Sequence, residues 1–259
     1  MGLYGFLKKG YYFFINTITL GNGVPITIND FKLKFPLKYH RYFPKDYEKD
    51  NFNFVRKHGR FRMISLDVGA HFGLFSIFLQ KESKGTVYAF EPTPSTIEII
   101  KETIKINHCE DSVHIIPSAV DERPGKAIFF INEVEGLSLA NSLIDYNNPE
   151  HPQKGYEVNV TSIDEFVKEK KVMVDFIKID AEGAELGVLK GARNTIMTTK
   201  PLIILSMHPG SITKRNESNE QIWNFLTPLN YKILFDGKQI DKKDFCNKTD
   251  LFDVQLISD

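Results

Sequence analysis

The first residues in this chain that could take part in binding or catalysis are an acid and two glycines around a predicted strand end. Residues 63–76 read MISLDVGAHFGLFS, which predicts an apolar strand ending at Asp67, a turn with Gly69 and Gly73, and an apolar helix. The glycines would let a ligand approach the backbone at the carboxyl end of the strand, where open α/β sheets bind cofactors. The spacing differs from the dinucleotide fingerprint, and Asp67 would repel a pyrophosphate. It therefore favours a ligand with a positively charged ammonium group.

The next two predicted strands also end in residues suited to a cofactor. Glu91 follows the first of them, twenty-two residues after Gly69, and this offset suits a carboxylate that accepts hydrogen bonds from both ribose hydroxyls. Pro92 then stops the strand. The following strand ends in the small residues Ser118 and Ala119, which leave room for a flat ring such as adenine.

Together these residues predict S-adenosylmethionine as the cofactor. Asp67 suits its amino group, Glu91 its ribose, and the small strand end at Ser118 and Ala119 its base. Each element alone occurs in many α/β proteins as a helix N-cap or half of an ion pair, so the prediction depends on their order and spacing. The residues expected to bind the cofactor are Asp67, Gly69, Ala70, His71, Gly73, Glu91, Pro92, Ser118, Ala119 and Asp180.

A second group of candidate residues follows two later apolar runs. The run 176–180 ends at Asp180, with Glu182 in the turn, and Lys178 shares a strand face with Asp180 because the strand period is two. A buried lysine needs a charged partner, so a structural ion pair with Asp180 or Glu182 is the alternative to a catalytic role. His208 follows the next run and is the natural general base for a hydroxyl. We expect Asp180, His208, Lys178 and Glu182 to be the catalytic residues.

The elements that position these residues alternate between short apolar runs and helix-length amphipathic segments from residue 63 onward. This alternation is typical of βαβ units in a parallel sheet. Extra strands are expected at 126–131 and 156–161, bracketing a long polar loop, 132–155, that is either a substrate lid or a surface excursion. The strands expected in the main sheet are 63–67, 86–91, 113–118, 176–180, 202–207, 232–235 and 254–257, which suffice for a seven-stranded doubly wound sheet.

The N-terminal part of the chain follows a different pattern. Residues 24–28 and 31–37 alternate around Asn29-Asp30, which predicts a β-hairpin, and 41–60 is expected to be mostly helical. We therefore divide the chain into a cap, residues 1–60, formed by a helix and the hairpin, and a catalytic domain, residues 61–259. The aromatic, lysine-flanked residues 1–20 form either a packed helix or a peripheral membrane contact.

The motifs resemble those of the FkbM family of S-adenosylmethionine-dependent methyltransferases. The matching residues are Asp67 to Ala70, Phe90 to Pro92, Ile177 to Gly183 and Val188 to Ala192, and the stretch 160–164 is similar to a further family element. The resemblance implies an α/β fold with the Rossmann-like, seven-stranded sheet of class I methyltransferases. It also implies methyl transfer to a hydroxyl, commonly on a sugar or a natural product. His71 departs from the asparagine common in relatives, and Ser206 replaces an acid that many relatives carry.

These observations predict an O-methyltransferase that acts on a hydroxyl of a sugar, a glycan or a glycosylated natural product. The alternatives are a small-molecule, protein or nucleic-acid methyltransferase of the same fold, or a non-catalytic adapter that binds S-adenosylmethionine. An oxidoreductase would need a pyrophosphate loop that the sequence lacks. Asp180 and Glu182 could ligate Mg²⁺, but two carboxylates are few ligands for a metal site, so no metal is assigned.

Composition limits the partners and the compartment. The chain of 259 residues is 42% hydrophobic and 25% charged, as expected for one folded domain with an elaborated end. Its 33 basic and 33 acidic residues balance, which argues against nucleic-acid partners. The two cysteines lack any disulfide or zinc spacing, so we expect a cytoplasmic location. The expected partners are a small molecule or glycan, and a second copy of the chain in a homo-oligomer is an open alternative.

Overall fold

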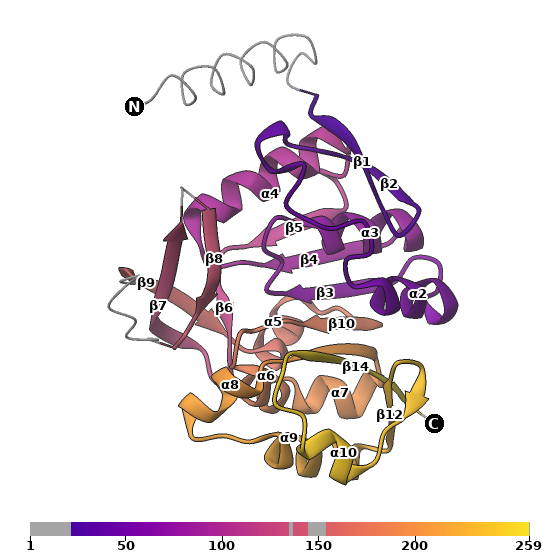
Figure 1. Ribbon diagram of the computed structural model, residues 1–259, viewed down its shortest axis with the longest axis vertical. Coiled ribbons are helices and arrows are strands. Elements are labelled where there is room, and N and C mark those ends of the chain that lie inside the picture. The colour runs from indigo at the N-terminus through magenta and orange to yellow at the C-terminus, as the bar shows by residue number, and fades with distance from the viewer. Residues whose placement is uncertain (1–21, 135–136, 145–153, 259) are drawn as a thin grey trace.

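The computed structural model describes residues 22–134, 137–144 and 154–258, which form two sheets, a hairpin and covering helices (Figure 1). Across these residues, no helix combines the length and apolarity that a bilayer-spanning segment needs. The segment expected to touch a membrane, residues 1–20, lies outside the described residues.

The N-terminal hairpin has the form that its sequence predicts. Strand β1 (Val24–Ile28) pairs antiparallel with β2 (Phe31–Phe35). Asn29 and Asp30 have φ angles of 48° and 64°, and two consecutive positive values are typical of the turn that matches the twist of a two-residue hairpin. Every second side chain of β2 is buried, so one hairpin face packs against the rest of the protein.

The main sheet contains all seven predicted strands and one more. Its order is β13-β12-β14-β11-β10-β3-β4-β5. The eighth strand, β13, has only two residues, too few to leave a pattern in the sequence. The bounds are β3 (Ile64–Val68), β4 (Thr86–Phe90), β5 (Val113–Ile116), β10 (Phe176–Ile179), β11 (Leu202–Met207), β12 (Tyr231–Phe235), β13 (Lys238–Gln239) and β14 (Phe252–Ser258).

The connections of this sheet create a crevice at its centre. The chain starts at β3, moves outward through β4 to β5, and later returns to β10 on the other side of β3. Strands β5, β4, β3, β10 and β11 are parallel neighbours, whereas β14 runs antiparallel to β11 and β12. Open α/β sheets bind ligands where the strand order reverses, beyond the carboxyl ends of the strands. Here that point lies between β3 and β10.

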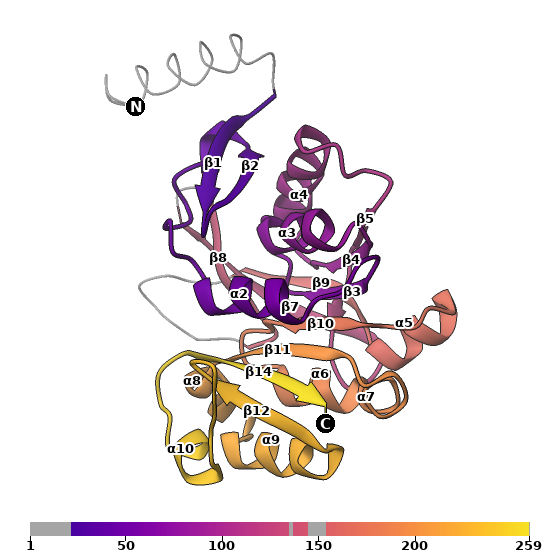
Figure 2. The same ribbon diagram turned by 90° about the vertical axis from the view of Figure 1, so that its right-hand side faces the viewer.

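Helices cover both faces of the main sheet, as Figure 2 shows. Side chains of α2, α3 and α4 share one buried cluster with the hairpin and the sheet. Side chains of α5 to α10 form the cluster on the opposite face. The doubly wound prediction is therefore confirmed. The helix bounds are α2 (Lys49–His58), α3 (Leu74–Ser83), α4 (Pro94–Ile106), α5 (Ile163–Lys170), α6 (Glu185–Gly191), α7 (Arg193–Thr199), α8 (Pro209–Ile212), α9 (Asn219–Leu226) and α10 (Lys242–Cys246).

The helical prediction for residues 41–60 is wrong over its first half. Only α2 is an α-helix there, and a short 3₁₀ turn, Leu37–Tyr39, precedes it. Pro44 cannot continue a helix, and Glu48, just before α2, has a left-handed φ of 46°. The segment between the two helices is therefore a folded turn.

A second sheet occupies much of the region that the sequence predicts to be a loop. Its order is β6-β9-β7-β8. Because β7 runs on to Val134 and pairs with β8, most of the described residues of the predicted loop 132–155 are in strands. The rest of that loop, 135–136 and 145–153, lies outside the described residues, as does any lid formed by it. The bounds are β6 (Ala119–Val120), β7 (Gly125–Val134), β8 (Leu137–Ser142) and β9 (Lys154–Thr161).

Candidate active site

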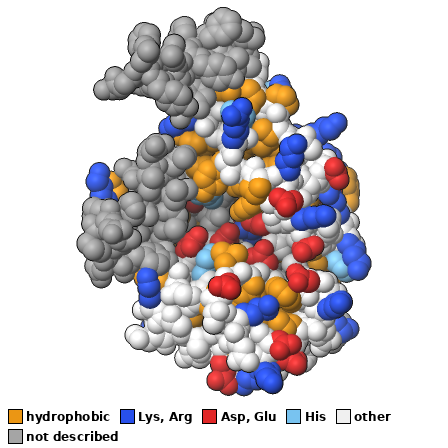
Figure 3. All heavy atoms as spheres, in the orientation of Figure 1, with side chains coloured by type: hydrophobic (Ala, Val, Ile, Leu, Met, Phe, Trp, Pro, Cys, Tyr) orange, Lys and Arg blue, Asp and Glu red, His pale blue; other side chains and the backbone are white. Residues whose placement is uncertain are grey.

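A cavity lies at the carboxyl ends of the central strands, between the two sheets. It holds about 920 Å³ of space outside protein atoms, open solvent at its mouth included. Figure 3 shows a hollow on this face where acidic side chains and a histidine gather beside hydrophobic ones. The cavity is lined by Tyr42, Tyr47, Val68, Gly69, His71, Phe90, Glu91, Pro92, Ser118, Ala119, Val120, Phe129, Leu143, Asp180, Ala181, Glu182 and Ala184.

The turn after β3 brings two backbones into contact at the floor of the cavity. Gly69 has a φ of +80°, and a Cβ placed on it would lie 1.9 Å from the carbonyl oxygen of Asp180. Only glycine fits there. The contact holds the end of β10 against the turn, so Asp180 is placed beside the predicted cofactor site.

Asp67 lies beneath this turn and does not line the main cavity. It is fully buried, and the Ser76 hydroxyl donates a hydrogen bond to its Oδ2 over 2.5 Å. Its Oδ1 has no hydrogen-bond partner among the described residues. Burial raises the pKa of Asp67. The structure places Asp67 in a small adjacent recess, together with Lys178 and Asp180.

Glu91 faces the cavity from the end of β4. Its carboxylate accepts hydrogen bonds from the backbone N–H groups of His71 (3.2 Å) and Thr93 (2.9 Å). Burial raises the pKa of Glu91 to about 7, even though these hydrogen bonds favour the ionised form. Pro92 lines the cavity next to it. A buried carboxylate with a raised pKa is typical of a functional site.

We expect Glu91 to make the stability of the protein fall with rising pH. The unfolded chain loses the Glu91 proton near pH 4.5, whereas the folded protein holds it until about pH 7. Between these values the unfolded state binds fewer protons, so folding becomes less favourable by about 2–3 kcal/mol. The Glu91→Gln variant has no titrating group at this position. Its free energy of unfolding relative to wild type should therefore rise by this amount between pH 4.5 and pH 8.

Urea unfolding of both proteins at the two pH values measures this gain. Glu98→Gln, on the exposed side of α4, is the matched control and should show no comparable change. A stability difference between Glu91→Gln and wild type that stays constant with pH would contradict the prediction.

Another part of the cavity wall is formed by small and apolar side chains. Ser118 and Ala119 line the cavity where β5 passes into β6, together with Phe129 of β7 and Leu143. This surface leaves room for a flat ring. Phe129 and Leu143 could not be predicted from the sequence, because they reach the cavity only through the pairing of the second sheet.

Lys178 lies below the cavity in a network of acids. Its Nζ is 2.9 Å from Oδ2 of Asp180 and 3.7 Å from Glu48, and Asp67 is its neighbour on β3. Burial alone would lower the pKa of Lys178, but these carboxylates raise it well above its usual value. Lys178 is therefore a charged support for Asp180, and the predicted pair is present.

The N-terminal segment contributes site residues that the sequence analysis missed. Tyr42 and Tyr47 line the cavity, and Glu48 is a partner of Lys178. Burial raises the pKa of Glu48, partly offset by Lys178. These residues carry no motif, and they come together only because the segment before α2 folds as a turn.

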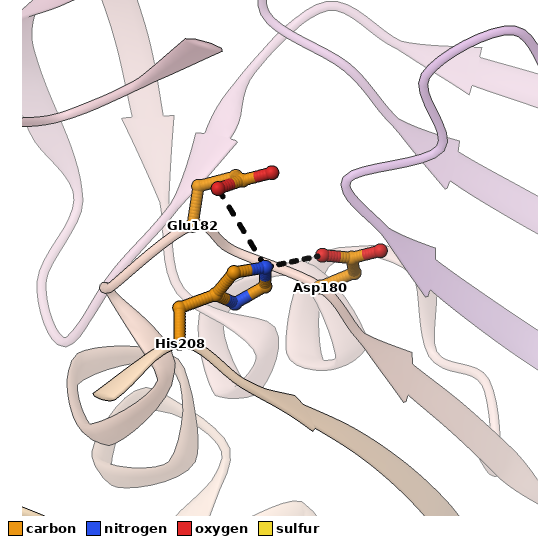
Figure 4. Close-up of side chains that lie close together, drawn as sticks. All are labelled: Asp180, Glu182 and His208. Atoms are coloured by element: carbon orange, nitrogen blue, oxygen red, sulfur yellow. Dashed lines mark ion pairs between the residues drawn. The ribbon is translucent and has the colours of Figure 1, made fainter. Parts of the chain in front are cut away.

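Asp180, Glu182 and His208 converge from the ends of two neighbouring strands (Figure 4). Nε2 of His208 lies 3.6 Å from Asp180 Oδ1 and 3.6 Å from Glu182 Oε2. Nδ1 of His208 is 2.8 Å from Oε1 of Glu185, which is fully buried at the start of α6. Glu185 was not predicted as a site residue, although it lies only two residues after the motif Ile177 to Gly183.

The charges of this cluster shift the pKa of each member. Burial alone would lower the pKa of His208, but the hydrogen bond to Glu185 and the charges of Asp180 and Glu182 raise it to about 9. Burial raises the pKa of Glu182 to about 7, against the effect of His208. Burial would also raise the pKa of Asp180, but Lys178 and His208 hold it below its usual value.

Of the predicted residues, eight line the main cavity and the others support it from outside. The eight are Gly69, His71, Glu91, Pro92, Ser118, Ala119, Asp180 and Glu182. Ala70 lies in the recess with Asp67 and Lys178. Gly73 precedes α3 in a left-handed conformation. His208 lies beside Asp180 and Glu182, which line the cavity.

The chain is similar to known methyltransferases. A family model described as the methyltransferase FkbM domain matches residues 67–233. Methyltransferase 1 of Beauveria bassiana is 23% identical over 144 residues, which cover 49% of this chain and 57% of that protein. Methyltransferase sdnD of Sordaria araneosa is 25% identical over 160 residues, covering 49% and 59%. The chain thus spans less than two thirds of the length of these curated relatives.

A solved structure, the methyltransferase FkbM from Methylobacillus flagellatus KT, superposes with a TM-score of 0.49 at 18% identity. The match covers 76% of this chain and 44% of that one. The sheet is the Rossmann-like sheet of class I methyltransferases, with β13 added to the seven expected strands. The chain belongs to the FkbM methyltransferase domain family.

Proposed function

We propose that this protein is an S-adenosylmethionine-dependent O-methyltransferase that acts on a hydroxyl of a sugar, a glycan or a glycosylated natural product. The observation that carries the proposal is one cavity lined both by Glu91 and Gly69 and by Asp180 and Glu182. It joins features suited to the cofactor with carboxylates suited to a hydroxyl.

The cavity residues fit S-adenosylmethionine. The Glu91 carboxylate keeps lone pairs for ribose hydroxyls, and Gly69 brings backbone to the cavity wall in the turn that packs against Asp180. Ser118, Ala119 and Phe129 offer a small apolar surface for the adenine ring. When bound, the cofactor supplies an activated methyl group on a sulfonium.

Two features favour oxygen as the acceptor. The turn after β10 reads Asp180-Ala181-Glu182-Gly183, and it lacks the Asn/Asp-Pro-Pro-Tyr/Phe type of element found in many enzymes that methylate amino groups. Asp180 and Glu182 instead face the cavity with carboxylates that can accept hydrogen bonds from a hydroxyl. Lys178 and Glu48 support Asp180 from below.

The side chains around these acids suit a carbohydrate. Tyr42 and Tyr47 line the cavity, and aromatic rings can pack against the apolar face of a sugar while carboxylates hold its hydroxyls. Positioning of the hydroxyl would provide most of the catalytic effect. The new O–C bond forms as the S–C bond of the sulfonium breaks, and the carboxylates of Asp180 and Glu182, which line the cavity, are placed to accept the hydroxyl proton.

The free thiols of Cys109 and Cys246 support a reducing compartment, so we propose a cytoplasmic location.

The test is product analysis with purified protein and ¹³C-methyl S-adenosylmethionine. The acceptors are simple glycans and glycosylated natural products, with a peptide and an RNA as alternatives. We expect a methyl ether on a glycan hydroxyl, with one S-adenosylhomocysteine per methyl group. Methyl transfer to nitrogen, or to the peptide or RNA alone, would overturn the proposed acceptor class.

A further inference from the structure

The trio of Asp180, Glu182 and His208 has the geometry of a metal site. One ligand atom from each lies within 4.8 Å of the other two. The imidazole nitrogen is 3.6 Å from both carboxylate oxygens, too far for good hydrogen bonds. Ligand atoms about 2.1–2.2 Å from a common ion lie about 3.0–3.6 Å apart. The two distances from Nε2 of His208 are therefore those expected between ligands of one cation.

A second layer of contacts orients two of these ligands. Glu185 is fully buried and holds Nδ1 of His208 at 2.8 Å, so that Nε2 faces the two carboxylates. Such carboxylate–histidine pairs fix the ring of a metal ligand. Lys178 holds Oδ2 of Asp180 at 2.9 Å, which leaves Oδ1 directed at His208. The other oxygen of Glu185, Oε2, is buried, and no described residue forms a hydrogen bond with it.

The position of the trio differs from that of a closed structural site. Asp180 and Glu182 also line the main cavity, so an ion held by them would be accessible to a ligand there. Three protein ligands with open positions are typical of catalytic ions.

We propose that Asp180, Glu182 and His208 bind one divalent cation of the transition series. An imidazole beside two carboxylates favours such an ion over Mg²⁺ or Ca²⁺, which prefer oxygen ligands alone. Its role rests on the proposed function: the ion binds the acceptor hydroxyl and lowers the pKa of that hydroxyl. Glu185 is a positioning residue that acts through His208.

Titration of the full chain, without an affinity tag, with Co²⁺ tests the site directly, because ligation by imidazole and carboxylate changes the visible spectrum of the ion. We expect one saturable site in wild type. His208→Ala and Glu182→Gln should weaken binding at least about 10-fold, and Glu185→Gln about 10- to 100-fold. His114→Ala, an exposed histidine on β5, is the matched control and should bind as wild type does. Circular dichroism and thermal unfolding verify that each variant is folded.

The result that would overturn the proposal is no saturable Co²⁺ site in wild type, or a site that folded His208→Ala and Glu182→Gln retain. Activity separates this inference from the proposed function. Methyl transfer that persists in EDTA would overturn the ion's role and leave the O-methyltransferase proposal standing. A Co²⁺ site lost in both variants would support the metal site even if no acceptor were methylated.

Discussion

Lys178→Met is expected to lower the free energy of unfolding by about 3–5 kcal/mol, because it leaves buried carboxylates without a compensating charge. Methionine has a similar length, so packing changes little while the positive charge is lost. Lys178 contacts Asp180 at 2.9 Å and Glu48 at 3.7 Å, and Asp67 is its partner across the sheet. Urea unfolding at neutral pH measures the loss.

Two further variants identify the cause of this loss. Lys126→Met removes an exposed lysine that pairs with Glu157 at 2.6 Å, and it should change stability by no more than about 1 kcal/mol. Adding Glu48→Gln to Lys178→Met removes one uncompensated acid and should recover part of the loss. If the free energy of unfolding of Lys178→Met lay within about 1 kcal/mol of the wild-type value, Lys178 would not be the charge that compensates the buried acids.

Much of the central sheet could be predicted because each strand is a short apolar run before a turn. The pair Lys178 and Asp180 was predicted for the same local reason, since the strand period places both on one face. The second sheet was only partly predictable. Strand β8 has the sequence LSLANS, with no β-branched or aromatic residue to indicate a strand, and its pairing with β7 depends on tertiary contacts.

The site could be predicted where its residues end strands, and not where distant segments meet. Glu91 and Asp180 follow apolar runs and face the cavity as expected. Glu48 and Tyr47 belong to a turn that was expected to be helical, so nothing in the sequence linked them to Lys178. The raised pKa of His208 could not be predicted from the sequence either, because it depends on three acids that only the folded chain brings together.

Glu91→Ala is expected to weaken the binding of S-adenosylhomocysteine at least about 100-fold, or about 3 kcal/mol. The carboxylate is placed to accept hydrogen bonds from two ribose hydroxyls, and each bond to a charged group contributes about 1.5–3 kcal/mol. Glu91→Gln keeps the shape and part of the accepting capacity, so its loss should be smaller. Glu98→Ala removes an exposed acid from α4 and should bind as wild type does.

Calorimetric titration of these four proteins with S-adenosylhomocysteine tests whether this cavity binds the cofactor, and it needs no acceptor. We expect micromolar binding by wild type and Glu98→Ala, weaker binding by Glu91→Gln, and a nearly complete loss in folded Glu91→Ala. No binding by wild type, or equal binding by wild type and Glu91→Ala, would contradict the assignment of this cavity to the cofactor.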